Sequence, residues 1–199
     1  RVFQRMGDGD KALAILREAE LDHPGHRAVL FRLVPTLAAR GQELRAAGDL
    51  EGAAAIDGEI VATASAALTG DEGRDTPGIK ALYQMHRAES LWRLGRIAEA
   101  GAGFEAAVAE ARAEAAAGRS IREAVSGVVA VVLAGAGDFL IRNGSLEEGV
   151  QRYREAAALS LEAGREDDAA ALLRKAGSGV RTLAESALTS MRYGESIRL

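Results

Sequence analysis

Three histidines are the side chains best suited to acid–base or metal chemistry in this sequence of 199 residues, which contains no cysteine. His23 and His26 are spaced so that both could ligate one metal ion. Only two carboxylates lie near them and no second cluster of ligands follows, so we interpret the pair as part of a turn. His86 lies in a helical pattern, where packing explains it better than catalysis. We expect no metal site.

The glycines and clustered carboxylates do not form a catalytic motif either. Gly135-Ala-Gly137 lies in a helical pattern without a lysine, whereas a phosphate-binding loop follows a strand and usually carries one. The runs Glu147-Glu148 and Glu166-Asp167-Asp168 open predicted helices, where the helix dipole favours negative charge. Asp71-Glu72 belongs to a predicted loop. The sequence therefore predicts a protein that is not an enzyme and has no cofactor.

Charge and hydropathy exclude two further classes of function. The 25 basic and 29 acidic residues give a formal net charge of −4 and are spread evenly, so a nucleic-acid surface is not expected. The longest apolar run, residues 124–137, has 14 residues, and a membrane-spanning helix needs about 20. Only three of the 25 basic residues are lysine, a bias typical of GC-rich bacterial genomes. We expect a bacterial, cytoplasmic protein.

The composition predicts an all-α fold. The hydrophobic share is 48% with only 4% aromatic residues and three prolines, which suits closely packed helices better than a sheet. The residues between 70 and 78 form the one clear loop, because they combine glycine and proline without a large apolar side chain. Helices are expected at residues 9–22, 26–47, 49–69, 78–94, 97–117, 120–143, 146–163 and 166–192. A kink or a break is expected in the last helix, at Gly177 and Gly179.

Glycines recur along the chain at the expected ends of alternate helices. The series Gly7, Gly48, Gly95, Gly144 has spacings of 41, 47 and 49 residues, and Gly194 extends it by 50. A left-handed glycine can end one helix, and Asp8, Asp49 or Ser145 directly after it can cap the next. The period predicts repeated helix–turn–helix units.

The surroundings of each glycine support helices that approach closely. Seven residues before it, and again five residues after it, the side chain is small. A leucine lies four residues before it at Leu44, Leu91 and Leu140. Nine residues after it the chain has a bulky residue, except at Asp57, which interrupts this pattern.

These features resemble the tetratricopeptide repeat (TPR). The best match is the run from Leu91 to Ala100, continuing to Phe104 and Ala107, and the resemblance extends over almost the whole chain. It departs from the family in repeat length, since the standard TPR has about 34 residues. The longer repeats are similar to those of large bacterial regulators, signalling ATPases or kinesin light chains.

The resemblance implies a right-handed α-solenoid of stacked antiparallel helix pairs, with residues 1–199 forming one array. It also implies that the first helix of each pair lines a concave groove. Positions ten, six, three and two before each glycine would face it. The groove candidates are Gln42, Arg45, Met85, Glu89, Trp92, Arg93, Asp138, Ile141, Arg142, Met191 and Arg192.

Two interpretations of the recurring arginines remain open. An arginine in the last turn of a helix can bind the free carbonyls there. Alternatively, the arginines form a ladder that binds an acidic protein or peptide, with Trp92 and Met85 as apolar anchors. The lysine and asparagine pattern of chaperone-binding TPRs is missing.

The sequence predicts a protein-binding scaffold. The alternative is a ligand-sensing or autoregulatory region of a larger bacterial transcription regulator or signalling ATPase. Because the repeat pattern is incomplete at residues 1–6 and after Gly194, we expect a slice of a longer protein that could self-associate through its open repeat ends.

Overall fold

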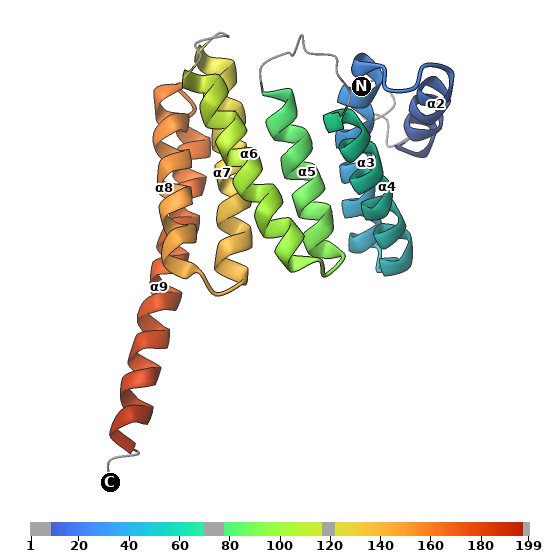
Figure 1. Cartoon of the computed structure of the whole chain (residues 1–199). Coiled ribbons are helices and arrows are strands. Elements are labelled where there is room, and N and C mark those ends of the chain that lie inside the picture. Colours follow the sequence, from blue (N-terminus) through green and yellow to red (C-terminus); the bar gives the residue numbers. More distant parts are fainter. Residues whose placement is uncertain (1–8, 70–77, 117–121, 197–199) are drawn as a thin grey trace. The chain divides into compact units, whose positions relative to one another are not determined.

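The computed structural model describes residues 9–69, 78–116 and 122–196, with side chains described except at 122–126, 183–184 and 186–196. These described residues form eight α-helices and no strand. The helices are α2 (Gly9–Asp22), α3 (Arg27–Ala46), α4 (Leu50–Thr69), α5 (Ile79–Arg93), α6 (Ile97–Ala116), α7 (Arg122–Arg142), α8 (Leu146–Glu162) and α9 (Glu166–Ser196). The all-α prediction is confirmed, and the predicted helices all form (Figure 1).

Helices α3 and α4, α5 and α6, and α7 and α8 form antiparallel pairs joined by tight glycine turns. Gly48, Gly95 and Gly144 have φ angles of 83°, 77° and 91°, which only glycine adopts readily. In each turn the N–H after the glycine donates to a leucine carbonyl 2.9 Å away, that of Leu44, Leu91 or Leu140. The recurring leucines therefore belong to helix-ending motifs of the Schellman type.

The expected caps after these glycines are only partly present. The Asp49 carboxylate accepts a hydrogen bond of 2.8 Å from the Gly52 N–H, as predicted. Ser145 occupies the cap position of α8 without a side-chain hydrogen bond to the helix, so this prediction is wrong. Asp8 and Gly7 lie outside the described residues.

Small residues allow the close approach that the sequence predicts. A Cβ atom added to Gly149 would lie 2.9 Å from the carbonyl oxygen of Gly137 on α7. One added to Gly103 on α6 would lie 2.9 Å from the Ala88 Cβ on α5. Since real Cβ contacts are longer, helices of these pairs pack backbone against backbone, and a larger residue would force them apart.

The chain forms two compact units, Arg1–Glu110 and Ala111–Leu199. In the first unit an apolar core extends over α2 to α5, with Leu33, Leu37 and Ile60 buried. In the second unit Val150 and Tyr153 of α8 pack against Ala176 of α9. Each unit is built from stacked antiparallel helix pairs, which confirms the predicted fold class.

Helix α9 differs from the sequence-based expectation. It continues through Gly177 and Gly179 without a break and through Gly194 to Ser196, so the predicted turn at Gly194 is wrong and the helix does not end at the two earlier glycines. A glycine inside a helix costs only about 1 kcal/mol relative to alanine. That cost does not end a helix by itself.

Candidate partner-binding face

Within each unit, the first helices of the pairs bring polar side chains toward solvent at two of the four predicted positions. Six residues before the turn glycine lie Gln42, which is exposed, and Glu89 and Asp138, which are half-buried. Two residues before the glycine lie Arg93 and Arg142, both exposed. These five residues are called the first-helix face below. They bring polar and charged groups to the solvent side of α3, α5 and α7.

The position ten residues before the glycine is buried, so the prediction that Met85 is an exposed groove anchor is wrong. Met85 is only 4% exposed, and Ala38 at the same position of α3 is 8% exposed. Each step of four residues rotates a position by about 40° around the helix axis, so position ten lies about 80° from position two and reaches the core side of the helix. Met85 instead belongs to the apolar core.

The position three residues before the glycine lies between the core and the surface. Ile141 is half-buried and packs against the apolar cluster of Val150, Tyr153 and Ala176. Trp92 is half-buried. Arg45 is half-buried and extends toward α4. Ile141 and Arg45 therefore connect their helices to the next helix of the chain.

Arg45 and Arg93 converge on one buried carboxylate, that of Asp57 on α4. Asp57 is 2% exposed. The Arg45 Nη1 donates to its Oδ2 at 2.7 Å, and the Arg93 Nη1 lies 3.5 Å from its Oδ1. The Ser90 hydroxyl donates to Oδ1 at 3.1 Å. Two of the predicted groove arginines are thus bound within the chain, and together with Asp57 they join α3, α4 and α5.

Sequence reasoning missed Asp57 as a site residue, although its signal was visible. Asp57 is the one residue nine positions after a turn glycine that is not bulky in that pattern, where Phe104 and Tyr153 stand in other pairs. Those two are also buried, at 1% and 3% exposed. A carboxylate at a core position requires cations nearby, and Arg45 and Arg93 supply them.

A second carboxylate, Asp138 on the first-helix face, joins the three helices of the second unit. The Tyr153 hydroxyl of α8 donates to Asp138 Oδ1 at 2.5 Å, and the Lys175 ammonium of α9 donates to Oδ2 at 3.0 Å. The same ammonium lies 5.4 Å from the centre of the Tyr153 ring. Burial, and then the hydrogen bond to Asp138, raise the pKa of Tyr153 above its usual value.

His86 lies near the first-helix face in the first unit. Its Nδ1 is buried without a hydrogen-bond partner and lies 4.0 Å from the Glu89 carboxylate. Burial, and secondly the charge of Arg93, lower the pKa of His86 to about 4. The imidazole is therefore neutral near pH 7, as expected for a packed histidine.

Two predicted site residues receive no structural description of their side chains. Met191 and Arg192 lie in the helical part of α9, but their side chains are outside the described residues. Because α9 does not turn at Gly194, the counting that placed them in a groove no longer applies.

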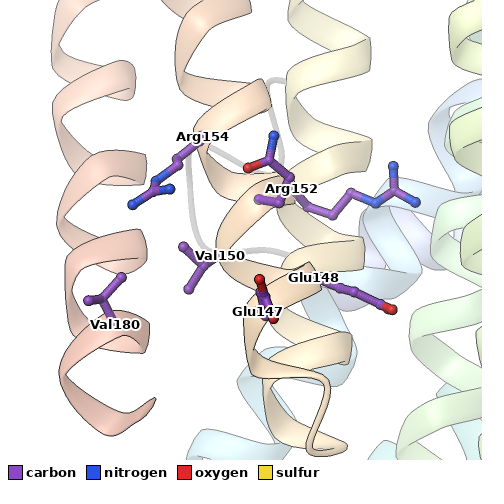
Figure 2. Close-up of a pocket in the computed structure, with 7 residues that line it drawn as sticks. Glu147, Glu148, Val150, Arg152, Arg154 and Val180 are labelled. Carbon is purple, nitrogen blue, oxygen red and sulfur yellow. The ribbon is translucent and has the colours of Figure 1, made fainter. Parts of the chain in front are cut away.

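A surface hollow of about 740 Å³ lies between α8 and α9 in the second unit. Its lining residues are Glu147, Glu148, Val150, Gln151, Arg152, Arg154 and Val180. Figure 2 shows Val150 and Arg154 pointing toward α9, whereas Arg152 and Glu148 point away from it. The charged groups diverge, so this hollow is not arranged like a catalytic site.

Two features are absent from the described part of the chain. No group of three or more His, Cys, Asp or Glu side chains there is arranged to hold a metal ion. None of the described helices combines the length and hydropathy that crossing a bilayer requires.

Comparison with known proteins identifies a fold. No protein family model matches the chain, and no curated protein matches it. Among solved structures it is similar to BtubC (BKLC) from P. vanneervenii, a TPR-like solenoid, with a TM-score of 0.61, 16% sequence identity, and coverage of 92% of this chain and 67% of that chain. The chain has a TPR-like fold.

Two structures of MamA, one of them a double mutant, also match but at lower similarity. Their TM-scores are 0.42 and 0.37 and their identities 14% and 13%. They cover 92% and 91% of this chain, and 95% and 90% of their own chains are covered.

Proposed function

We propose that this protein is a non-enzymatic scaffold that binds a protein or peptide partner through its first-helix face. The observation that carries the proposal is a pattern of polar side chains: one lies six residues before the turn glycine in α3, α5 and α7, and an exposed arginine lies two residues before it in α5 and α7. The TPR-like fold supports it, because repeat proteins commonly bind partners through the same positions of successive repeats.

The contacts within the chain restrict which residues bind the partner. Arg45 and Arg93 already neutralise Asp57, so they contribute less free positive charge than an arginine ladder requires. We propose Gln42 and Arg142, which are exposed, as partner contacts, with Trp92 as a half-buried apolar contact. Arg142 suits a carboxylate on the partner, because a guanidinium can donate two parallel hydrogen bonds to it.

The test compares partner binding by three proteins: the wild type, Arg142→Glu and Arg154→Glu. Both variants reverse one exposed charge, but Arg154 lies on α8, away from the first-helix face. Affinity capture from the source organism identifies the partner, and titration calorimetry then measures its affinity for each protein. Far-ultraviolet circular dichroism confirms equal helicity.

The expected result is a partner that binds the wild type and Arg154→Glu equally and binds Arg142→Glu at least about tenfold more weakly, which corresponds to about 1.4 kcal/mol. Equal binding to all three proteins, or equal loss from both variants, would contradict a partner site on the first-helix face.

A further inference from the structure

The chain contains a single asparagine, Asn143, and a glycine follows it directly. The two residues form the tight turn between α7 and α8, where both are exposed. Three other described turns of the same type join α3 to α4, α5 to α6 and α8 to α9, and there the residue before the glycine is Ala47, Leu94 or Ala163. Among these four turns, only the α7–α8 turn places a side-chain amide next to the glycine.

An asparagine followed by glycine can lose its side-chain amide without an enzyme. The backbone nitrogen of the glycine attacks the asparagine Cγ, a C–N bond forms, and the side-chain nitrogen leaves as ammonia. The glycine N–H gives its proton to a base in the solvent, and water protonates the leaving nitrogen. Water then opens the five-membered succinimide ring at either carbonyl, which produces aspartate or isoaspartate. Glycine favours ring closure because it has no Cβ atom to obstruct it.

The folded turn restrains both reacting groups. The Asn143 Nδ2 donates to the Phe139 carbonyl oxygen at 2.8 Å, so the side-chain amide is directed back along α7. The Gly144 N–H donates to the Ile141 carbonyl oxygen at 3.3 Å. Attack requires that this nitrogen lose its proton, and a hydrogen-bonded amide must open before its proton leaves. The α7–α8 turn must therefore open before the ring can close.

The hydrogen bond that restrains the glycine nitrogen is longest at this turn. The corresponding bonds donated by Gly48, Gly95 and Gly164 measure 3.1, 3.0 and 3.0 Å, compared with 3.3 Å at Gly144. Because the turn is exposed to solvent, water is also available for hydrolysis of the succinimide. The α7–α8 turn thus combines the reactive pair of residues with the longest of the four hydrogen bonds.

Either product of the reaction is expected to weaken the end of α7. A carboxylate oxygen replaces the Nδ2 donor, so the hydrogen bond to the Phe139 carbonyl is lost. The new negative charge lies at the C-terminal end of a helix, where the helix dipole disfavours it. Isoaspartate also adds a methylene group to the backbone, which disturbs the hydrogen bond of 2.9 Å from the Ser145 N–H to the Leu140 carbonyl.

We propose that Asn143 is a site of spontaneous deamidation that the α7–α8 turn holds back, and that the reaction irreversibly loosens this turn. The rate in the folded chain then depends on how often the turn opens. Each molecule that has reacted carries one additional negative charge. The conformation of the turn, and no modifying enzyme, controls this modification.

The first test compares the reaction in the folded and the unfolded chain. The full chain is incubated in mildly alkaline buffer with and without a denaturing concentration of guanidinium chloride. Peptide mass spectrometry follows the mass increase that replacement of the amide by a carboxylate produces at Asn143. The unfolded chain is expected to react at least about tenfold faster than the folded chain. Equal rates, or an unfolded chain that does not react, would overturn the proposal.

The control for this test is Asn143→Gln, which retains a side-chain amide. Its reaction would require a larger ring, which closes much more slowly. We expect no mass increase at this position in either the folded or the unfolded variant. A variant that gains mass as fast as the wild type would show that attack by the Gly144 nitrogen is not the cause.

The second test opens the turn without changing the reactive pair. Gly149→Ala forces α7 and α8 apart, because the added Cβ atom would lie 2.9 Å from the Gly137 carbonyl oxygen. Gly103→Ala is the matched control, since its Cβ atom would lie 2.9 Å from the Ala88 Cβ atom on α5. Circular dichroism checks that both variants remain folded.

Gly149→Ala is expected to deamidate at least about threefold faster than the folded wild type, because its turn opens more often. Gly103→Ala is expected to react at the rate of the wild type, and all three proteins are expected to react equally fast when unfolded. A Gly149→Ala variant that reacts no faster than Gly103→Ala would contradict control of the reaction by the turn.

The third test measures the effect of the reaction and needs no substitution. Ion-exchange chromatography separates the reacted chain by its additional negative charge. Hydrogen exchange then measures the protection of the Gly144 and Ser145 amides relative to the unfolded chain. Their protection is expected to fall at least about threefold, whereas that of Gly48 and Asp49 in the α3–α4 turn stays the same. Unchanged protection at Gly144 and Ser145 would contradict a loosened turn.

Discussion

One position of the repeat is buried in three helix pairs, although its side chain differs in each of them. Nine residues after the turn glycine, Asp57, Phe104 and Tyr153 are all buried. Phe104 fills the site with apolar volume. Tyr153 reaches a carboxylate through its hydroxyl, and Asp57 is itself the carboxylate and binds two arginines. The position therefore joins neighbouring helices whether or not its side chain is polar.

Removing the charge of Asp57 is expected to destabilise the first unit strongly. Asp57→Asn leaves Arg45 and Arg93 without their buried counter-charge, and breaking such an ion pair typically costs about 3–5 kcal/mol. We expect about 3 kcal/mol, the lower end of that range, because both arginine side chains are 26% exposed. Urea denaturation followed by circular dichroism measures this loss of unfolding free energy.

Glu59→Gln is the matched control for that substitution. Glu59 lies two residues after Asp57 on α4 and accepts a hydrogen bond of 2.8 Å from Arg17. Its side chain is 31% exposed and that of Arg17 is 45% exposed, and exposed ion pairs contribute at most about 1 kcal/mol. An equal loss in both variants would show that the burial of Asp57 has no special role.

Acid is expected to destabilise the protein through His86. Its pKa is about 4 in the folded chain, below the ordinary value of 6.5, so the unfolded chain binds a proton first as the pH falls. Stability contributed by the neutral imidazole is therefore lost between about pH 6.5 and pH 4, by roughly 3 kcal/mol in total. Urea denaturation at several pH values measures the slope.

The loss of unfolding free energy that His86 causes in acid can be distinguished from the loss that carboxylates cause. His86→Gln keeps a neutral polar side chain at this position and removes the titrating group. We expect this variant to lose less stability than the wild type over the same pH range. Identical slopes in the two proteins would indicate that other groups cause the acid sensitivity.

At the scale of elements, glycine has opposite effects in turns and in helices. Gly48 ends α3 with a φ of 83°, so Gly48→Ala is expected to cost about 1–2 kcal/mol in backbone strain. Gly58 lies inside α4 with no atom within 4 Å of an added Cβ, so Gly58→Ala is expected to stabilise by about 0.5–1 kcal/mol. Thermal unfolding measures the change in stability of each variant relative to the wild type. Changes of the same sign in both variants would refute the explanation.

The helices could be predicted from sequence because local signals determine them. Turn glycines, leucines four residues earlier and small residues at the contact positions placed α3 to α8 within a few residues of their observed bounds. The prediction of a turn at Gly194 failed because the same local signal does not determine whether a following helix packs against the preceding one. Glycine permits a turn, and packing of the next helix is needed to favour it over a continuous helix.

The candidate site was predicted less completely, because it depends on contacts between helices. The positions of Glu89 and Asp138 follow from helical period, and both side chains are half-buried in the structure. The prediction of Met85 as a groove residue failed because a set of four positions taken from a family pattern does not distinguish the buried side of a helix from its exposed side. The network around Asp57 joins residues up to 48 positions apart in the sequence. A periodic pattern does not reveal contacts between residues so far apart in the chain.

At the scale of the whole molecule, two compact units divide a chain whose repeat pattern is continuous. The boundary at Glu110 falls inside α6, where the sequence offers no proline or charge run to mark it. Each unit contains one carboxylate that joins three successive helices, Asp57 in the first and Asp138 in the second. Cohesion between neighbouring pairs is thus partly electrostatic in a protein whose core is mostly alanine, leucine and valine.

The Asp57 network has a consequence for how such an array can evolve. In a solenoid each repeat contacts its neighbours, so gene duplication or deletion can change the number of helix pairs as if they were interchangeable modules. Asp57 makes the α3–α4 pair dependent on the α5–α6 pair, because α5 must supply Arg93 and Ser90. A copy placed before α7 would meet Arg142 at the arginine position and Phe139 in place of the serine. The order of the pairs is therefore constrained by chemistry, and a rearranged gene would need a compensating substitution at position 57.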